Sequence, residues 1–217
     1  MEFIVVGVQR TGTNYCTEIL KSLNKKNECD IIETGDRQYL WKHALPNESG
    51  PNYSKKFNTP LDAVLNNDLS IVLIHKNPLW WLSSIINRNS ADLSRQRPFV
   101  YNDKVLDIKK ALFFYADFYL QWLDLVPERK VTHVSYHEIL NDCTSFSSKL
   151  NEKYGLSFNA SIDLHSLSVP YSKGDYESRR RIYNNEQYDL EDDVLRECYD
   201  SLTPDLKFVF QKLGYFF

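Results

Sequence analysis

The chain opens with Met1-Glu-Phe-Ile-Val-Val-Gly-Val-Gln-Arg-Thr-Gly-Thr-Asn14, and this stretch decides the fold. Residues 3–6 are an apolar, β-branched run, which predicts a buried strand. Gly7 and Gly12 bound a short polar loop, and a helical pattern of apolar residues begins at Thr13. The stretch therefore predicts a strand, a glycine-bounded loop and a helix in immediate succession.

A loop of this kind favours phosphate binding, because backbone N–H groups and the positive end of a helix converge on the anion. The spacing of Gly7 and Gly12 fits a Walker A motif, but Thr13 and Asn14 stand where that motif has Lys and Ser or Thr. Cleavage of a nucleoside triphosphate needs that Lys on the phosphates and that hydroxyl on Mg²⁺. This loop instead carries its cation internally, at Arg10, which predicts binding of a terminal phosphate without a metal.

Length and composition narrow the class of protein. A chain of 217 residues suits a single domain spanning residues 1–217. Its 26 basic and 29 acidic residues speak against a duplex nucleic acid as partner. The apolar start is too short for a signal peptide, and residues 111–126 are too short and too often interrupted by polar residues to span a membrane. We therefore expect a cytoplasmic protein without membrane contact; its oligomeric state is not predicted.

The cysteines show no CxxC spacing and no paired histidine pattern, so we expect reduced, mostly buried thiols and no metal site. They are Cys16, Cys29, Cys143 and Cys198.

Apolar runs and helical patterns alternate along the chain. Strands are predicted at residues 3–6, 29–33, 70–76 and 130–135. Helices are predicted at residues 13–24, 61–66, 79–87, 103–126 and 144–154, and as a pair within 189–215 that divides at Thr203-Pro204. This alternation indicates an α/β fold of three layers, in which helices flank a central, mostly parallel sheet of about four to five strands, as in P-loop proteins. Ligands of such sheets bind beyond the carboxyl ends of the strands.

Two predicted strand ends carry polar and basic residues. The first leads into the loop with Arg10, and the third ends at Lys76, with Ser84 on the helix that follows. If both strands belong to one parallel sheet, these three side chains face one ligand with two separate phosphates. For Lys76 taken alone, a solvated charge at the end of a strand is an equally good interpretation.

These residues resemble the sulfotransferases that use 3′-phosphoadenosine 5′-phosphosulfate. In that family the first strand leads into a loop of the form Lys/Arg-Ser/Thr-Gly-Thr-Thr/Ser-aromatic, which is similar to Arg10-Thr-Gly-Thr-Asn-Tyr15. The third strand of the family ends in Arg/Lys-Asn/Asp-Pro with a Ser eight residues after the basic residue, which is similar to Lys76-Asn-Pro78 and Ser84. Tyr136-His-Glu-Ile-Leu140 matches a later family segment loosely. The resemblance covers most of the chain and is specific at the first two motifs.

The resemblance implies where the donor binds. Arg10 and the amides around Gly12 hold the 5′-phosphate and the sulfuryl group, and Lys76 and Ser84 hold the 3′-phosphate. Lys76 replaces the commoner Arg and so loses the bidentate geometry of a guanidinium. Arg180, in the basic run Arg179-Arg-Arg181, is expected to close over the 3′-phosphate unless this run is a plain solvated surface. Further donor contacts are expected from Thr11, Thr13 and Asn14, and Tyr15 is expected to stack on adenine.

The resemblance also implies a catalytic base. Cytosolic members carry Lys-Thr-His-Leu-Pro after the second strand, and here Lys42-His-Ala-Leu-Pro46 places the His one position earlier. His43 is then the base and Lys42 a cation on the transferring group, while an anchor for the loop is the alternative role for this segment. An ordinary imidazole is largely neutral at pH 7 and accepts a proton. Glu33 is the second candidate base.

The function implied is sulfuryl transfer from 3′-phosphoadenosine 5′-phosphosulfate to a hydroxyl or amine of a small-molecule or carbohydrate acceptor, without a metal. A nucleotide or small-molecule kinase is the first alternative, and the missing Lys after Gly12 speaks against it. A non-catalytic nucleotide- or glycan-binding relative is the second, and the shifted His keeps it open.

Overall fold

The computed structural model describes residues 1–9, 11–26, 28–32, 42–49, 56–86, 107–159, 162, 164, 190 and 192–217. The chain forms two compact units, each made of two segments. Unit 1 combines Met1–His75 with Gln121–Glu186, and unit 2 combines Lys76–Leu120 with Gln187–Phe217. The single domain expected from the chain length stays a prediction.

Unit 1 is built on a four-stranded sheet in the order β2-β1-β3-β4. Its strands are all parallel, and in the pairing of the two central ones Val6 lies opposite Leu73. β3 is buried along its whole length, as expected for a central parallel strand that is covered on both faces. The predicted α/β class is confirmed. The strands are β1 (Glu2–Val6), β2 (Asp30–Ile31), β3 (Leu69–His75) and β4 (Val131–Ser135).

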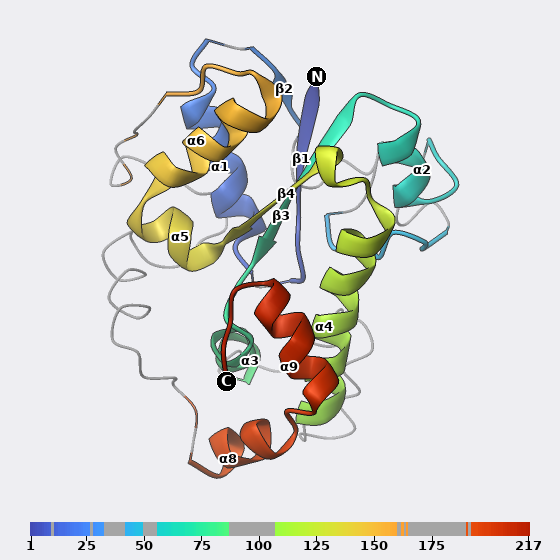
Figure 1. Ribbon diagram of the computed structural model, residues 1–217, viewed down its shortest axis with the longest axis vertical. Coiled ribbons are helices and arrows are strands. Elements are labelled where there is room, and N and C mark those ends of the chain that lie inside the picture. The colour runs from blue at the N-terminus through green and yellow to red at the C-terminus, as the bar shows by residue number, and fades with distance from the viewer. Residues whose placement is uncertain are drawn as a thin grey trace. The chain divides into compact units, whose positions relative to one another are not determined.

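Helices cover this sheet on both sides, as Figure 1 shows. One face packs against α1 (Thr13–Leu23), α5 (Tyr136–Asn141) and α6 (Cys143–Tyr154) in a continuous apolar cluster. The strands contribute alternate residues to this cluster, Val72 and Ile74 from β3 for example, because successive side chains of a strand point to opposite faces. The short helix α2 (Pro60–Leu65) contacts β3 and lies on the other side.

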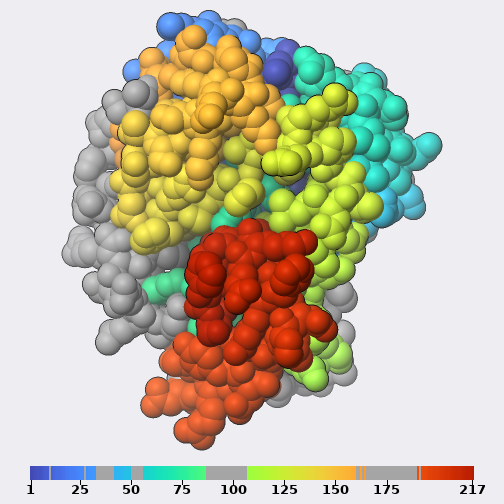
Figure 2. Space-filling model, in the orientation of Figure 1, coloured from blue at the N-terminus to red at the C-terminus, as the bar shows by residue number. Residues whose placement is uncertain are grey.

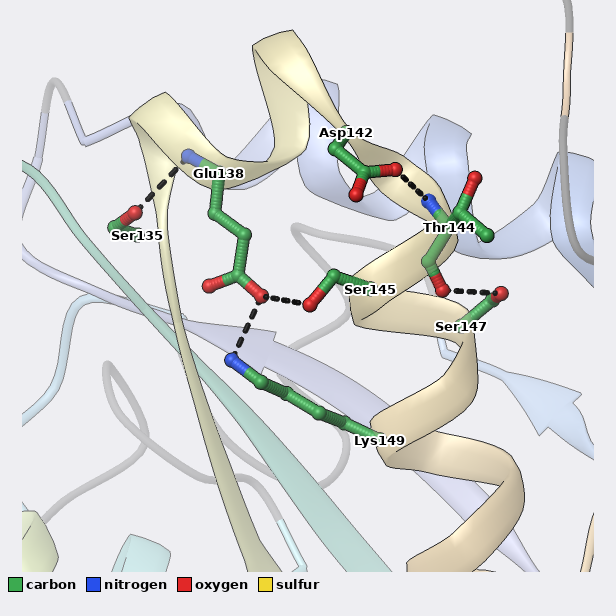
Figure 3. A network of polar contacts seen from close by, with 7 residues as sticks. All are labelled: Ser135, Glu138, Asp142, Thr144, Ser145, Ser147 and Lys149. Carbon is green, nitrogen blue, oxygen red and sulfur yellow. Dashed lines mark hydrogen bonds and ion pairs between the residues drawn. The ribbon is translucent and has the colours of Figure 1, made fainter.

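The corner between α5 and α6 is fixed by the polar network drawn in Figure 3. Ser135 caps α5 by accepting the N–H of Glu138 at 3.0 Å, and Asp142 caps α6. The Glu138 carboxylate then accepts from Lys149 Nζ at 2.7 Å and from Ser145 Oγ at 3.3 Å. The sequence analysis did not predict α5, because six residues are too few for a clear helical period. Both helices lie at the surface of unit 1, in yellow and orange in Figure 2.

Unit 2 is helical and packs around aromatic rings. The Tyr115 ring lies 4.7 Å from the rings of Trp81 and Tyr119 and 6.1 Å from that of Phe210, centroid to centroid. The predicted division at Thr203-Pro204 is confirmed, because the Thr203 hydroxyl caps the last helix. The helices are α3 (Pro78–Ile86), most of α4 (Ile108–Leu125), α8 (Asp192–Asp200) and α9 (Pro204–Lys212).

Three further findings concern membrane spans, cysteines and metal ions. None of the helices described is long and apolar enough to cross a membrane. All four cysteines are buried and none forms a disulfide, as expected. The described ranges contain no group of three or more His, Cys, Asp or Glu side chains arranged to hold a metal ion.

Candidate functional site

The loop between β1 and α1 is shaped around Gly12. This residue has φ 93°, in the left-handed region, and is the N-cap of α1. A Cβ at this position would lie 2.3 Å from Cε2 of Tyr136, so the tyrosine ring closes the space that any side chain needs. The first turn of α1 carries no acidic residue, so its N–H groups keep the positive potential that attracts an anion.

Thr11 in this loop and Tyr15 in α1 are also predicted to contact the donor. Thr11 is fully buried, and its hydroxyl donates to the Val8 carbonyl at 2.6 Å, which commits it to an internal hydrogen bond. Tyr15 is 3% exposed and packs edge-on against Tyr136 within the apolar cluster. The Thr11 hydroxyl and the Tyr15 ring thus make contacts within the protein.

Lys42 and His43 lie against this loop. The N–H of Gly7 donates to the Lys42 carbonyl at 3.0 Å, and His43 Nδ1 lies 2.6 Å from the Gly7 carbonyl oxygen. Lys42 Nζ donates to Asn14 Oδ1 at 2.5 Å, on the first turn of α1. The residues predicted to act on the transferring group thus meet the predicted phosphate loop, although they lie about thirty positions away in the chain.

The contact with Gly7 defines the chemistry of His43. A carbonyl oxygen only accepts hydrogen bonds, so Nδ1 carries the proton and Nε2 holds the lone pair. The pKa of His43 is lowered to about 3, mainly by burial and additionally by the charge of Lys42, while the bond to Gly7 acts in the opposite direction. The ring is therefore neutral at pH 7. An anion bound beside it would raise this pKa and make Nε2 more basic.

Lys42 is a partly buried amine, and burial lowers its pKa to about 8. We expect acylation of Lys42 by an amine-directed reagent to rise with a midpoint near pH 8, well below the ordinary lysine value of about 10.4. Asn14→Leu should move this midpoint lower, because the amide oxygen stabilises the charged amine. Peptide mass spectrometry after labelling across a pH series measures both midpoints, and a Lys42 midpoint near 10 would contradict this prediction.

Unit 2 holds the second group of predicted residues. Lys76 is 6% exposed, and its Nζ donates to Ser84 Oγ at 3.0 Å. Ser84 Oγ donates in turn to the carbonyl of Trp80 at 2.7 Å. A turn at Asn77, whose side chain accepts the N–H of Leu79, folds α3 back so that the two residues meet. The interpretation of Lys76 as a solvated charge is therefore wrong, and the pairing of Lys76 with Ser84 is observed.

Tyr115 contributes a contact that the sequence analysis missed. Its hydroxyl accepts the backbone N–H of Lys76 at 3.0 Å and donates to the Lys76 carbonyl. In the sequence Tyr115 has the spacing of a core residue of a helix, and it is fully buried. No periodicity reveals the partner of a single hydroxyl, so no pattern in the chain pointed to this role.

Three predicted site residues, Arg10, Glu33 and Arg180, lie outside the described residues, and their roles stay predictions. His75, the last residue of β3, is 2% exposed and stacks on His133 with 5.7 Å between the ring centroids.

Comparison with known proteins finds a likeness among solved structures. No protein-family model matches this sequence, and no curated protein matches it. Among solved structures, the chain is similar to mouse sulfotransferase SULT7A1 complexed with PAP, with a TM-score of 0.45 and 13% sequence identity. The alignment covers 98% of this chain and 81% of that one. An identity and a TM-score this low assign no family.

Proposed function

We propose that this protein is a sulfotransferase. It moves a sulfuryl group from 3′-phosphoadenosine 5′-phosphosulfate to a hydroxyl or amine of a small-molecule or carbohydrate acceptor. The observation that carries the proposal is the docking of Lys42 and His43 on the loop between Gly7 and Asn14. A cation and a neutral imidazole with an accepting nitrogen lie at the start of a helix, where an anion is favoured.

The donor is held by its two ends. Its 5′-phosphate binds the N–H groups that begin α1, with Arg10 as the loop cation. Its 3′-phosphate binds Lys76 Nζ and Ser84 Oγ, with Arg180 as a further cation. β1 and β3 are parallel neighbours in the sheet, so the segments that follow them leave from the same edge.

The transfer itself is an in-line displacement at sulfur. The acceptor oxygen or nitrogen forms a bond to sulfur while the bond from sulfur to the 5′-phosphate oxygen breaks. Adenosine 3′,5′-bisphosphate leaves with that electron pair, and the acceptor proton passes to His43 Nε2 or, as the second candidate, to Glu33. Arg10 and Lys42 stabilise the charge that develops on the bridging oxygen. Positioning and charge stabilisation carry most of such a reaction, as in phosphoryl transfer.

A second candidate is a nucleotide-binding protein without catalysis. It is favoured by the pKa of His43 near 3, because a base this weak takes a proton poorly at neutral pH unless a bound anion raises its pKa. Turnover separates the two candidates, since both bind the nucleotide.

Calorimetry with adenosine 3′,5′-bisphosphate, with and without Mg²⁺, tests the binding half of the proposal. We expect binding that does not depend on the metal, because Thr13 and Asn14 replace the residues that serve a metal-bound triphosphate. Binding of ATP with Mg²⁺ alone would contradict the proposal and favour a kinase.

Transfer of labelled sulfate from the donor to a panel of phenols and sugars tests the catalytic half. His43→Gln should bind the bisphosphate like the parent protein but lose most turnover, since general bases contribute about 10²- to 10⁴-fold. A His43→Gln protein with full turnover would move the role of the base to Glu33, for which Glu33→Gln is the matching variant.

A further inference from the structure

The Tyr115 hydroxyl forms two hydrogen bonds with the backbone of Lys76. It accepts the Lys76 N–H at 3.0 Å and donates to the Lys76 carbonyl. A phenolic hydroxyl has one proton to donate, and Tyr115 gives it to this carbonyl. Lys76 directly follows β3 in the chain, beyond the last residue of the β3–β4 pairing, so a side chain satisfies its backbone there in place of a neighbouring strand.

The tyrosine is itself firmly placed. It is fully buried, with the Trp81 and Tyr119 rings 4.7 Å away and the Phe210 ring 6.1 Å away. Burial raises the pKa of Tyr115 well above its ordinary value, so the hydroxyl keeps the proton that it donates to Lys76. A well-packed aromatic ring with a protonated hydroxyl is a rigid support for the backbone that it binds.

The ammonium end of Lys76 is restrained as well. Its Nζ donates to Ser84 Oγ at 3.0 Å, and Ser84 Oγ donates to the Trp80 carbonyl at 2.7 Å. A lysine in solution carries a flexible stem and a point charge without the rigid fork of arginine. Fixing both its backbone and its ammonium before a ligand arrives lowers the entropy that binding costs. Pre-organisation therefore compensates for lysine at a position where the family it resembles more often has arginine.

We propose that Tyr115 is a positioning residue that sets the preference for a nucleotide with a 3′-phosphate over the same nucleotide without one. The inference rests on the proposed function, because it takes Lys76 and Ser84 as the 3′-phosphate contacts. Tyr115 does not touch the ligand. It acts through the backbone of Lys76 and thereby determines the position of the Lys76 ammonium group.

The test compares the affinities of adenosine 3′,5′-bisphosphate and adenosine 5′-phosphate by calorimetry. Tyr115→Phe keeps the ring and removes the hydroxyl, and we expect it to lower the preference for the bisphosphate about tenfold, the effect of losing one or two hydrogen bonds. Its affinity for the 5′-phosphate should stay unchanged. Tyr154→Phe is the matched control, because it removes a hydroxyl that bonds Thr132 and leaves the Lys76 contacts in place.

A double variant separates positioning from general stability. Lys76→Met should remove most of the preference, and adding Tyr115→Phe to Lys76→Met should cause no further loss, since Tyr115 acts on the phosphate through Lys76. An unchanged preference in folded Tyr115→Phe would overturn the inference and leave the proposed function standing. A parent protein that binds both nucleotides equally, or neither, would overturn both.

Hydrogen exchange in the parent protein gives a readout that needs no variant. The Lys76 amide should exchange slowly, because it donates to a buried hydroxyl, and the bisphosphate should slow it further while the 5′-phosphate does not. Fast exchange at Lys76, or equal protection by both nucleotides, would overturn the role of Tyr115 even if Tyr115→Phe fails to fold.

Discussion

Gly12→Ala is expected to destabilise the protein by about 3 kcal/mol, the sum of backbone strain and overpacking, and to abolish binding of adenosine 3′,5′-bisphosphate. Gly12 has φ 93°, and this left-handed conformation costs any residue with a Cβ about 1–2 kcal/mol. The added Cβ would also lie 2.3 and 2.4 Å from two ring carbons of Tyr136. Either the ring or the loop must move, and the amides that begin α1 then lose their arrangement.

Gly155→Ala is the matched control for this substitution. Gly155 also has a positive φ, 65°, at the end of α6, but nothing lies within 4 Å of the Cβ that alanine would add. Gly155→Ala should therefore lower the free energy of unfolding only by the strain of the left-handed backbone, about 1 kcal/mol. It should leave nucleotide binding intact. Urea unfolding of both variants measures the difference. Equal destabilisation would contradict the steric role of Tyr136, and removal of the ring in Tyr136→Leu should recover part of the Gly12→Ala loss.

We expect the protein to lose stability as the pH falls below about 6.5. The pKa of His75 is lowered to about 3, mainly by burial and additionally by the charges of the neighbouring His133 and Lys149. In the unfolded chain this imidazole binds a proton near pH 6.5, so the unfolded state holds more protons below that pH. Stability from His75 is thus complete above pH 6.5 and decreases as the pH falls towards 3. At pH 5 the loss from His75 alone is ~2 kcal/mol, and His43 acts in the same direction.

Urea unfolding at pH 7 and pH 5 measures this effect. His75→Phe removes the titrating ring and should reduce the difference between the two pH values by ~2 kcal/mol. His137→Gln removes an exposed imidazole of α5 and controls for the loss of a histidine as such. A pH difference that is the same in His75→Phe and in the parent protein would show that His75 is not the group responsible.

Much of unit 1 was predictable from local patterns. Each of the four predicted strands overlaps one strand of the sheet, and the central strand β3 is buried along its whole length, as its apolar run predicts. The pairing of Lys76 with Ser84 was also predictable, from the resemblance and from the proline that begins α3. Lys42 and His43 contact the loop between Gly7 and Asn14, which agrees with the prediction that these two residues act on the group held by this loop.

Other features were not predictable because they depend on single polar atoms and on contacts between distant segments. The Tyr115 hydroxyl meets the backbone of a residue 39 positions away, and helical periodicity marks only that the ring is buried. The fit of Tyr136 over Gly12 likewise joins a loop to a helix of a later segment. The resemblance implies that Tyr15 stacks on adenine, and the packing of its ring against Tyr136 in the apolar cluster is a further contact between distant segments. The division of the chain into two units has no signal in composition.

A crystal structure of the protein with adenosine 3′,5′-bisphosphate tests the central claim most directly. We predict the 5′-phosphate within hydrogen-bonding distance of the N–H groups of Gly12, Thr13 and Asn14. We predict the 3′-phosphate within hydrogen-bonding distance of Lys76 Nζ and Ser84 Oγ. A nucleotide bound away from the β1–α1 loop, or a 3′-phosphate that contacts neither Lys76 nor Ser84, would contradict the proposed donor site.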